Sequence, residues 1–179
     1  MKQNLILLIL LFLSFGAWAQ ENAITLGGGY AFATIEDTDK QATGYRINGL
    51  YEYNPVGGKF AHGFSFGYIG LSATENSITS KVNSFPIYYA PKFMFGSDKF
   101  KGFIKGALGM QFASLKREGP LLDVSDSDFG FYGGGGAGAM FFLNEKIFLS
   151  AEYEIAWLSN GYYKDGWVNS INGGIGFKF

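Results

Sequence analysis

The sequence of 179 residues contains no cysteine and only one histidine. The absence of cysteine excludes a disulfide framework and a lipid anchor on a cysteine behind a signal peptide. A single histidine excludes a metal site built from several histidines. After residue 19, no apolar run reaches the roughly 18 residues that a transmembrane helix needs, so any crossing of a membrane has to use strands.

Charged residues are also few, at 16% of the chain, with 14 basic against 15 acidic side chains. This balance provides no basic surface for nucleic acid, so we expect no nucleic-acid partner. The abundant residues are glycine, phenylalanine and tyrosine, which occur 27, 19 and 11 times. How these residues are spaced along the chain therefore decides the fold class.

The first 19 residues predict a secretory signal peptide. Lys2 precedes an apolar run at residues 5–15, and a small-x-small motif follows at Ala17-Trp18-Ala19, before Gln20. Such a run is too short to span a membrane as a helix and is correctly flanked for cleavage after Ala19, although a retained N-terminal anchor is the alternative. Residues 20–179 then form one domain, whose length suits a single fold.

The stretch Trp167–Phe179 shows the repeating pattern of this domain. Alternate residues such as Ile175 and Phe177 form one apolar face, and the residues between them are small or polar. This period of two predicts a strand with one face in an apolar medium. Pro86 and Pro91 each remove a ladder donor from the fourth such run, so we expect local bulges there. The pattern predicts eight strands, at residues 23–33, 43–53, 59–71, 82–95, 100–113, 129–143, 147–159 and 167–179.

The connections between these strands alternate in length. Long polar loops are expected at 35–42, 72–81, 114–128 and 160–166, and short turns at 54–58, 96–99 and 144–146. This layout is typical of an outer-membrane barrel, with the turns in the periplasm and the loops outside. Because an open strand edge in lipid costs several kcal/mol per bare group, the last strand must pair with the first. The sequence therefore predicts an all-β fold, a closed eight-stranded antiparallel up-and-down transmembrane β-barrel.

The end of the chain carries a resemblance to a known family. The pattern Asn172-x-Gly174-x-x-Phe177-x-Phe179 resembles the C-terminal signal of small eight-stranded outer-membrane β-barrels of the OmpX/OmpA type, and the Gly- and Tyr-rich sequence is similar to barrel domains of Bacteroidota. The resemblance implies export through the periplasm, recognition by the barrel-assembly machinery and insertion into the lipid of a Gram-negative outer membrane. The family is functionally mixed, so it transfers no active-site residues.

Eight charged residues share the non-aromatic face of the predicted strands. This position would be costly in lipid and suits a polar lumen. In a soluble, lipocalin-like barrel the aromatic face would point inward instead, but an eight-stranded interior has too little room for so many large rings. The predicted lumen residues are Arg46, Glu52, Lys92, Lys101, Lys105, Glu152, Glu154 and Lys178.

In so narrow a lumen we expect these charges to pair with one another and close the barrel, because open channels are usual at 16 to 18 strands. The alternative is a narrow, porin-like diffusion channel, in which the excess of lysine would favour small anions. The first reading predicts a structural or surface-interaction protein, and the second predicts a transport protein.

Two sequence patterns suggest nucleotide binding or catalysis, but the neighbouring residues that each function requires are missing. Residues 133–138 satisfy G-x-G-x-x-G, but the sequence continues as a strand and not as the helix that a dinucleotide site requires. The second residue after His62 is Phe64, whereas a barrel of the lipid A deacylase type would need a serine there, in a His-x-Ser pair. We therefore expect neither a cofactor nor an enzyme.

The aspartates of the longest predicted loop, Asp123, Asp126 and Asp128, lack the glycine and the distal glutamate of an EF-hand, so we expect no metal site. Loops on a rigid scaffold nonetheless carry most specific contacts. Tyr162, Tyr163 and Trp167 make the last loop the best candidate for binding an unidentified surface partner.

Overall fold

The structure, a computed structural model, describes residues 21–36, 40–55, 58–120 and 122–179. The signal peptide expected at residues 1–19 lies outside the described residues. Among those residues, no helix has the length and apolar character needed to cross a membrane. They form nine strands: β1 (Glu21–Ile35), β2 (Gln41–Asn54), β3 (Phe60–Glu75), β4 (Ile78–Tyr89), β5 (Lys92–Gly96), β6 (Phe100–Gly119), β7 (Leu122–Phe142), β8 (Ile147–Leu158) and β9 (Tyr163–Lys178).

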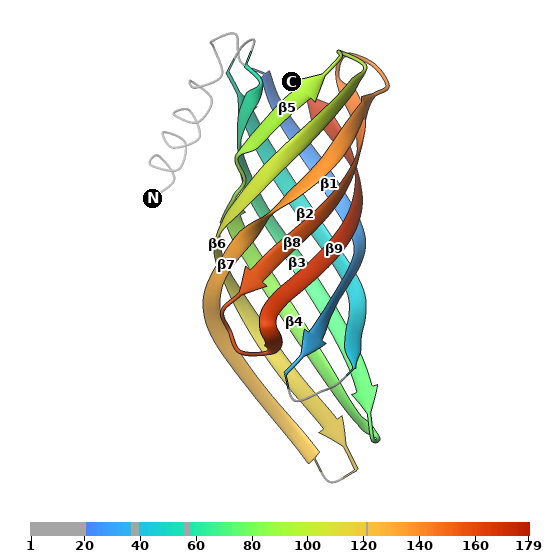
Figure 1. Cartoon of the computed structure of the whole chain (residues 1–179), viewed down its shortest axis with the longest axis vertical. Helices are drawn as coiled ribbons and strands as arrows, with labels where there is room; N and C mark the ends of the chain where they lie inside the picture. Colours follow the sequence, from blue (N-terminus) through green and yellow to red (C-terminus); the bar gives the residue numbers. More distant parts are fainter. Residues whose placement is uncertain (1–20, 37–39, 56–57, 121) are drawn as a thin grey trace, which may run out of the picture.

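These strands close into a ring (Figure 1). Neighbours are antiparallel, and the ring closes where β1 pairs with β9. Because β4 and β5 both lie between β3 and β6, they share one place, and the described strands fill eight positions. Backbone hydrogen bonds of 3.2 and 2.9 Å between Asn22 and Phe179 extend the closure to the last residue. The predicted eight-stranded up-and-down barrel is confirmed.

The fourth predicted strand, at 82–95, is interrupted between β4 and β5. We expected only bulges here, and that expectation is wrong: Ala90 and Pro91 belong to neither strand. Pro91 has no N–H to donate to the ladder. The neighbouring strands nevertheless bridge the gap, since the Ala90 N–H donates to the Gly63 carbonyl and the Gly106 N–H to the Pro91 carbonyl, both at 2.8 Å.

Period-two alternation sets the two faces of the barrel wall. On β8, Leu149, Tyr153 and Ile155 are exposed outward, whereas Phe148 and Glu154 are buried inside. The same separation of an exposed apolar band from an inner face continues around the ring. The outer band provides the apolar surface that lipid requires.

The glycine run of β7, whose facing the sequence left open, places Gly136 and Gly138 toward the lumen. A Cβ on Gly138 would lie 2.6 Å from the Phe103 ring, and one on Gly136 would lie 2.9 Å from Glu152 Oε1. Both distances are shorter than any real Cβ contact. Glycine here makes room for the backbone carbonyls of β8, a ring and a carboxylate.

Two hairpins project beyond the rest of the barrel at the end opposite the C-terminus (Figure 1). The β3–β4 hairpin turns at Asn76 and Ser77, whose φ angles of 48° and 66° are those of a tight type I′ turn. The β6–β7 hairpin stays paired up to Gly119 and Leu122. The predictions of loops at 72–81 and 114–128 are therefore wrong. Outside lipid neither face of a strand needs apolar residues, so the alternation that reveals the membrane strands is absent there.

Residues 72–75 of β3, 78–83 of β4, 114–119 of β6 and 122–131 of β7 form one continuous four-stranded extension, here named the projecting sheet. The end of the barrel that carries it is the loop end. The opposite end, which carries the short connections at 97–99 and 143–146 and the C-terminus, is the turn end.

Candidate functional site

Glu154 of β8 is the centre of a buried polar cluster in the lumen. Its side chain is fully buried and forms ion pairs of 2.7 Å with Arg46 Nη1 and with Lys105 Nζ. The hydroxyl groups of Tyr88 and Tyr132 also donate to its carboxylate. These partners come from β2, β6, β4 and β7, because inward side chains converge in a barrel of eight strands.

Further contacts complete this lumen cluster. Lys105 also forms an ion pair with Glu152. Arg46 donates to the Tyr88 hydroxyl at 2.7 Å and to Ser170 Oγ at 3.3 Å. Two basic and two acidic side chains thus balance one another. Buried charges are tolerated only when they are paired and hydrogen-bonded in this way.

The other four predicted lumen residues lie outside the cluster. Lys92 Nζ lies 2.6 Å from Glu52 Oε1 and 4.5 Å from the centroid of the Phe103 ring, forming a separate buried pair. Lys101 and Lys178 lie at the turn end, where they line an open cavity. The eight predicted charges therefore divide into a cluster of four, a pair and two residues at the mouth.

Sequence reasoning did not identify three members of the lumen cluster. They are Tyr88 of β4, Tyr132 of β7 and Ser170 of β9. Each occupies an inward position of its strand, which is the one signal that the sequence offers. The register between strands decides which hydroxyl groups reach Glu154, and the sequence does not give this register.

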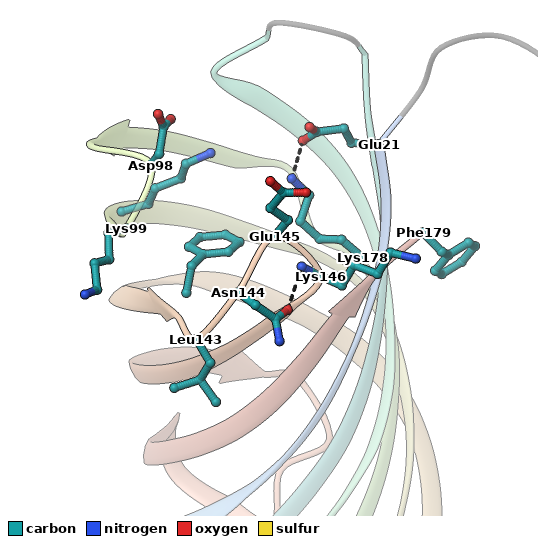
Figure 2. Close-up of a pocket in the computed structure, with 11 residues that line it drawn as sticks. Glu21, Asp98, Lys99, Leu143, Asn144, Glu145, Lys146, Lys178 and Phe179 are labelled. Carbon is teal, nitrogen blue, oxygen red and sulfur yellow. Dashed lines mark hydrogen bonds and ion pairs between the residues drawn. The ribbon is translucent and has the colours of Figure 1, made fainter.

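Apolar layers lie on either side of the polar residues. On the loop side, buried side chains such as Ile69 and Leu158 fill the lumen, and on the turn side Phe103, Met140 and Phe148 pack together. Cavities near the turn-side layer measure only about 30 and 20 Å³. Each has room for about one water molecule. A larger cavity of about 690 Å³ opens at the turn end (Figure 2).

The residues of the predicted assembly signal all lie on β9 or directly after it. Phe177 and Phe179 face outward, with their ring centroids 6.3 Å apart. Asn172 faces the lumen and donates from Nδ2 to Ser170 Oγ at 3.1 Å, and Gly174 lies on the same inner face. Recognition by the assembly machinery stays a prediction.

The aromatic residues predicted for an exposed loop tip do not form one. Tyr162 and Tyr163 are only 6% and 2% exposed, and the Tyr163 hydroxyl lies 2.9 Å from Ser84 Oγ. Trp167 is exposed, but it lies on the outer face of β9 and is paired with Trp157, within the apolar band. The prediction is wrong because β9 begins at Tyr163, whose inward position continues the alternation of that strand.

The projecting sheet has an open edge along β7. The last residue pair between β7 and β8 is Tyr132 with Leu158, whereas β7 remains paired with β6 as far as Leu122. In the part of the chain that the structure describes, no strand pairs with residues 122–131 on the side away from β6. An open edge of this kind is a template for pairing with another chain.

Three N–H groups on this side of β7 already have hydrogen-bond acceptors. The Phe131 N–H donates to Ser159 Oγ at 2.7 Å, so the odd-numbered N–H groups of β7 point toward the open side. Those of Ser127 and Phe129 donate to the carboxylates of the aspartates that precede them, at 2.9 and 2.8 Å. These contacts protect the edge from indiscriminate pairing.

The projecting sheet also separates its charges. Lys81 and Lys116 both bind Glu118, at 3.0 and 2.6 Å. The hydrogen bond from Lys116, with that from Lys81, lowers the pKa of Glu118 to about 2. The aspartates of β7 are exposed and have no ion pair with a described residue: Asp123, Asp126 and Asp128. The open edge is therefore acidic.

The described part of the chain contains no group of three or more His, Asp or Glu side chains placed to hold a metal ion. His62 lies on the outer face near the turn end, with Nδ1 2.6 Å from the Tyr89 hydroxyl.

Comparison with known proteins agrees with this architecture. Residues 5–179 match the family described as outer membrane protein beta-barrel domain. No curated protein sequence gives a match. Three solved structures illustrate the fold. Neisserial surface protein A is 16% identical with a TM-score of 0.69, covering 88% of this chain and 97% of that one. Ail, the attachment invasion locus protein of Yersinia pestis, is 18% identical with a TM-score of 0.60, covering 90% and 100%.

The third, the outer membrane enzyme PagL, is 15% identical with a TM-score of 0.53, covering 86% of this chain and 97% of that one. At such low identity these likenesses establish the fold alone. The same barrel supports an enzyme and proteins of other kinds, so the function has to be argued from this chain's own residues.

Proposed function

Because the chain belongs to the outer membrane protein β-barrel domain family and lies in the outer membrane of a Gram-negative bacterium, we propose that it is a closed, non-enzymatic barrel that binds a cationic surface partner along the open edge of β7. The observation that carries this proposal is the stretch 122–130, which no described strand pairs on the side away from β6, with its three aspartates. In a barrel of this layout the long hairpins face outside the cell.

A cationic, extended polypeptide fits this edge for two reasons. Its main chain would supply the hydrogen bonds that β8 does not supply to residues 122–130, as in strand addition. Its basic side chains would attract the carboxylates of Asp126 and Asp128 away from the N–H groups of Ser127 and Phe129. The same contacts that protect the edge therefore favour a partner of positive charge.

The lumen supports the closed form of the barrel over the diffusion channel that the sequence left as an alternative. Glu154 and its partners occupy the middle of the lumen, with an apolar layer on each side. An ion crossing this lumen would have to break buried ion pairs, which is costly. The internal cavities of about 30 and 20 Å³ leave room for single waters.

Binding of synthetic peptides to the folded protein in lipid nanodiscs tests the proposal. We expect an alternating Lys-Thr peptide to bind and an alternating Glu-Thr peptide not to bind. The triple variant Asp123→Asn, Asp126→Asn and Asp128→Asn should lower the affinity at least tenfold. Ser125→Pro, which removes an N–H from the open edge, should also weaken binding.

The matched control removes the same charge at the turn end, with Glu21→Gln, Asp98→Asn and Glu145→Gln. An equal loss in this control, or no binding of the Lys-Thr peptide to the wild type, would refute the surface-binding proposal. Conductance in a planar bilayer tests closure separately. We expect no ionic current through the bilayer. Discrete current steps whose size changes in the variant Lys105→Met would favour the channel.

A further inference from the structure

The cavity of about 690 Å³ at the turn end is separate from both the lumen cluster and the projecting sheet (Figure 2). It is here named the vestibule. Its walls come from β1, β6, β7 and β9 and from the turns at 97–99 and 143–146. The turn-side apolar layer around Phe148 lies beneath it. Its volume falls within the range of small-molecule sites, about 300–1,000 Å³. By the usual layout of such barrels it opens to the periplasm.

Two lysines converge on one aromatic ring in this vestibule. Lys101 Nζ lies 5.3 Å and Lys178 Nζ lies 5.7 Å from the centroid of the Phe142 ring. The face of the ring attracts each ammonium group, but two cations near one ring also repel each other. An anion between them would remove this repulsion.

Only one of these two ammonium groups has a carboxylate partner. Lys178 Nζ lies 2.7 Å from Glu21 Oε2, and the Glu21 side chain is 52% exposed. An ion pair so open to water contributes little to stability, so another anion can readily replace the Glu21 carboxylate. Among the described residues, no carboxylate lies within ion-pair distance of Lys101. Lys101 is therefore available to a ligand, and Lys178 becomes available when Glu21 is displaced.

The remaining charged groups of the vestibule are Asp98, Lys99, Glu145 and Lys146, which balance one another. Figure 2 shows Lys99 and Lys146 extending away from Lys178 and Glu21. The carboxyl group of Phe179 lies at the rim. The positive charge inside the cavity thus rests on Lys101 and Lys178.

We propose that the vestibule binds a phosphate ester whose phosphate is held by Lys101 and Lys178. Lysine is a compact point charge that suits the several oxygens of a phosphate, whereas a planar carboxylate is best matched by arginine, and no described arginine lines this cavity. The apolar side chains of Phe142 and Leu143 would contact the carbon part of the ester. Such a group comes either from a free phosphate ester in the periplasm or from a phospholipid headgroup.

Titration calorimetry on the folded full-length barrel in a zwitterionic detergent tests this inference, with glycerol 3-phosphate and dihexanoyl phosphatidylglycerol as probes. The wild type should bind at least one probe, and Lys101→Met should lower its affinity at least tenfold. Glu21→Gln should increase the affinity, because the competing carboxylate is lost. Lys146→Met, the matched control with the same charge change, should stay within twofold of the wild type.

Binding of glycerol 3-phosphate identifies a free ester as a sufficient ligand, and binding of the lipid probe alone identifies the headgroup. Either result supports the site. Heat-modifiable migration on a gel verifies that each variant is folded. The inference is overturned if the folded wild type binds neither probe, or if Lys146→Met loses as much affinity as Lys101→Met.

Discussion

Strand β6 passes through two environments that treat the same side chain differently. In the lumen, Lys105 is buried and paired with Glu152 and Glu154. In the projecting sheet, Lys116 is half exposed and bound to Glu118. A buried charge without a partner costs several kcal/mol, whereas water replaces a lost partner at the surface. The lumen therefore constrains its residues tightly, whereas the projecting sheet constrains its residues little.

The largest effect is expected from Glu154→Gln. This change removes a carboxylate with four partners and leaves Arg46 without an acidic partner. Loss of one member of a buried ion pair lowers the free energy of unfolding by about 3–5 kcal/mol. Urea unfolding of the barrel in lipid vesicles measures this loss in the free energy of unfolding. Glu118→Gln is the matched control and should leave the free energy of unfolding nearly unchanged, because its ion pairs are exposed to water. Equal effects of the two variants would abolish the contrast between the regions.

A smaller loss is expected from filling the lumen with Gly138→Leu. A side chain at this position has to displace both the Ala151 carbonyl and the Phe103 ring, which packs within the turn-side apolar layer. Overpacking of this kind costs about 1–3 kcal/mol. Gly119→Ala, at the tip of the projecting sheet, is the control and should leave the free energy of unfolding unchanged. A harmless Gly138→Leu would mean that the lumen is loosely packed.

The same contrast explains how far the sequence could predict this protein. Lipid on one side imposes period-two alternation, so the strands and the inward positions of residues such as Arg46 and Glu154 follow from the chain alone. The contact between them does not, because β2 and β8 meet across the lumen through the registers of all the strands between them. Water on both sides removes the alternation, so residues 114–128 were mistaken for a loop.

The prediction for the last loop, at residues 160–166, was wrong for a related reason. Its aromatic residues suggested a partner-binding surface, but Tyr163 continues the alternation of β9 and lies inside the barrel. Ser84, its hydroxyl partner, lies on β4, far away in the sequence. Composition alone does not distinguish a ring that closes the lumen from one that meets a partner.

Shortening the projecting sheet should affect the barrel less than either lumen change. Replacing residues 117–124 by Asn-Gly joins Lys116 to Ser125, which are already paired across the hairpin, through a favoured two-residue turn. Because Leu115 and the rest of the loop-side apolar layer are retained, the free energy of unfolding should change by less than about 1 kcal/mol. Heat-modifiable migration and urea unfolding check this. A variant that no longer folds would show that the hairpin nucleates the barrel.

The smallest effect is expected on the pH dependence of stability that arises from the Glu118 carboxyl group. Hydrogen bonds from Lys116 and Lys81 lower its pKa to about 2, so any stability that it contributes is present above the pKa of the unfolded chain and is lost as the pH falls through about 2. Carbon-13 NMR of the Glu118 carboxyl group should find this low midpoint. In the double variant Lys81→Met and Lys116→Met the midpoint should return toward about 4.3, the ordinary value for glutamate. Because water screens these exposed ion pairs, the urea midpoint of the wild type should fall only slightly relative to that of Glu118→Gln as the pH falls from 5 to 2. A large relative fall would show that the ion pairs of the projecting sheet stabilise the barrel, as those of the lumen do.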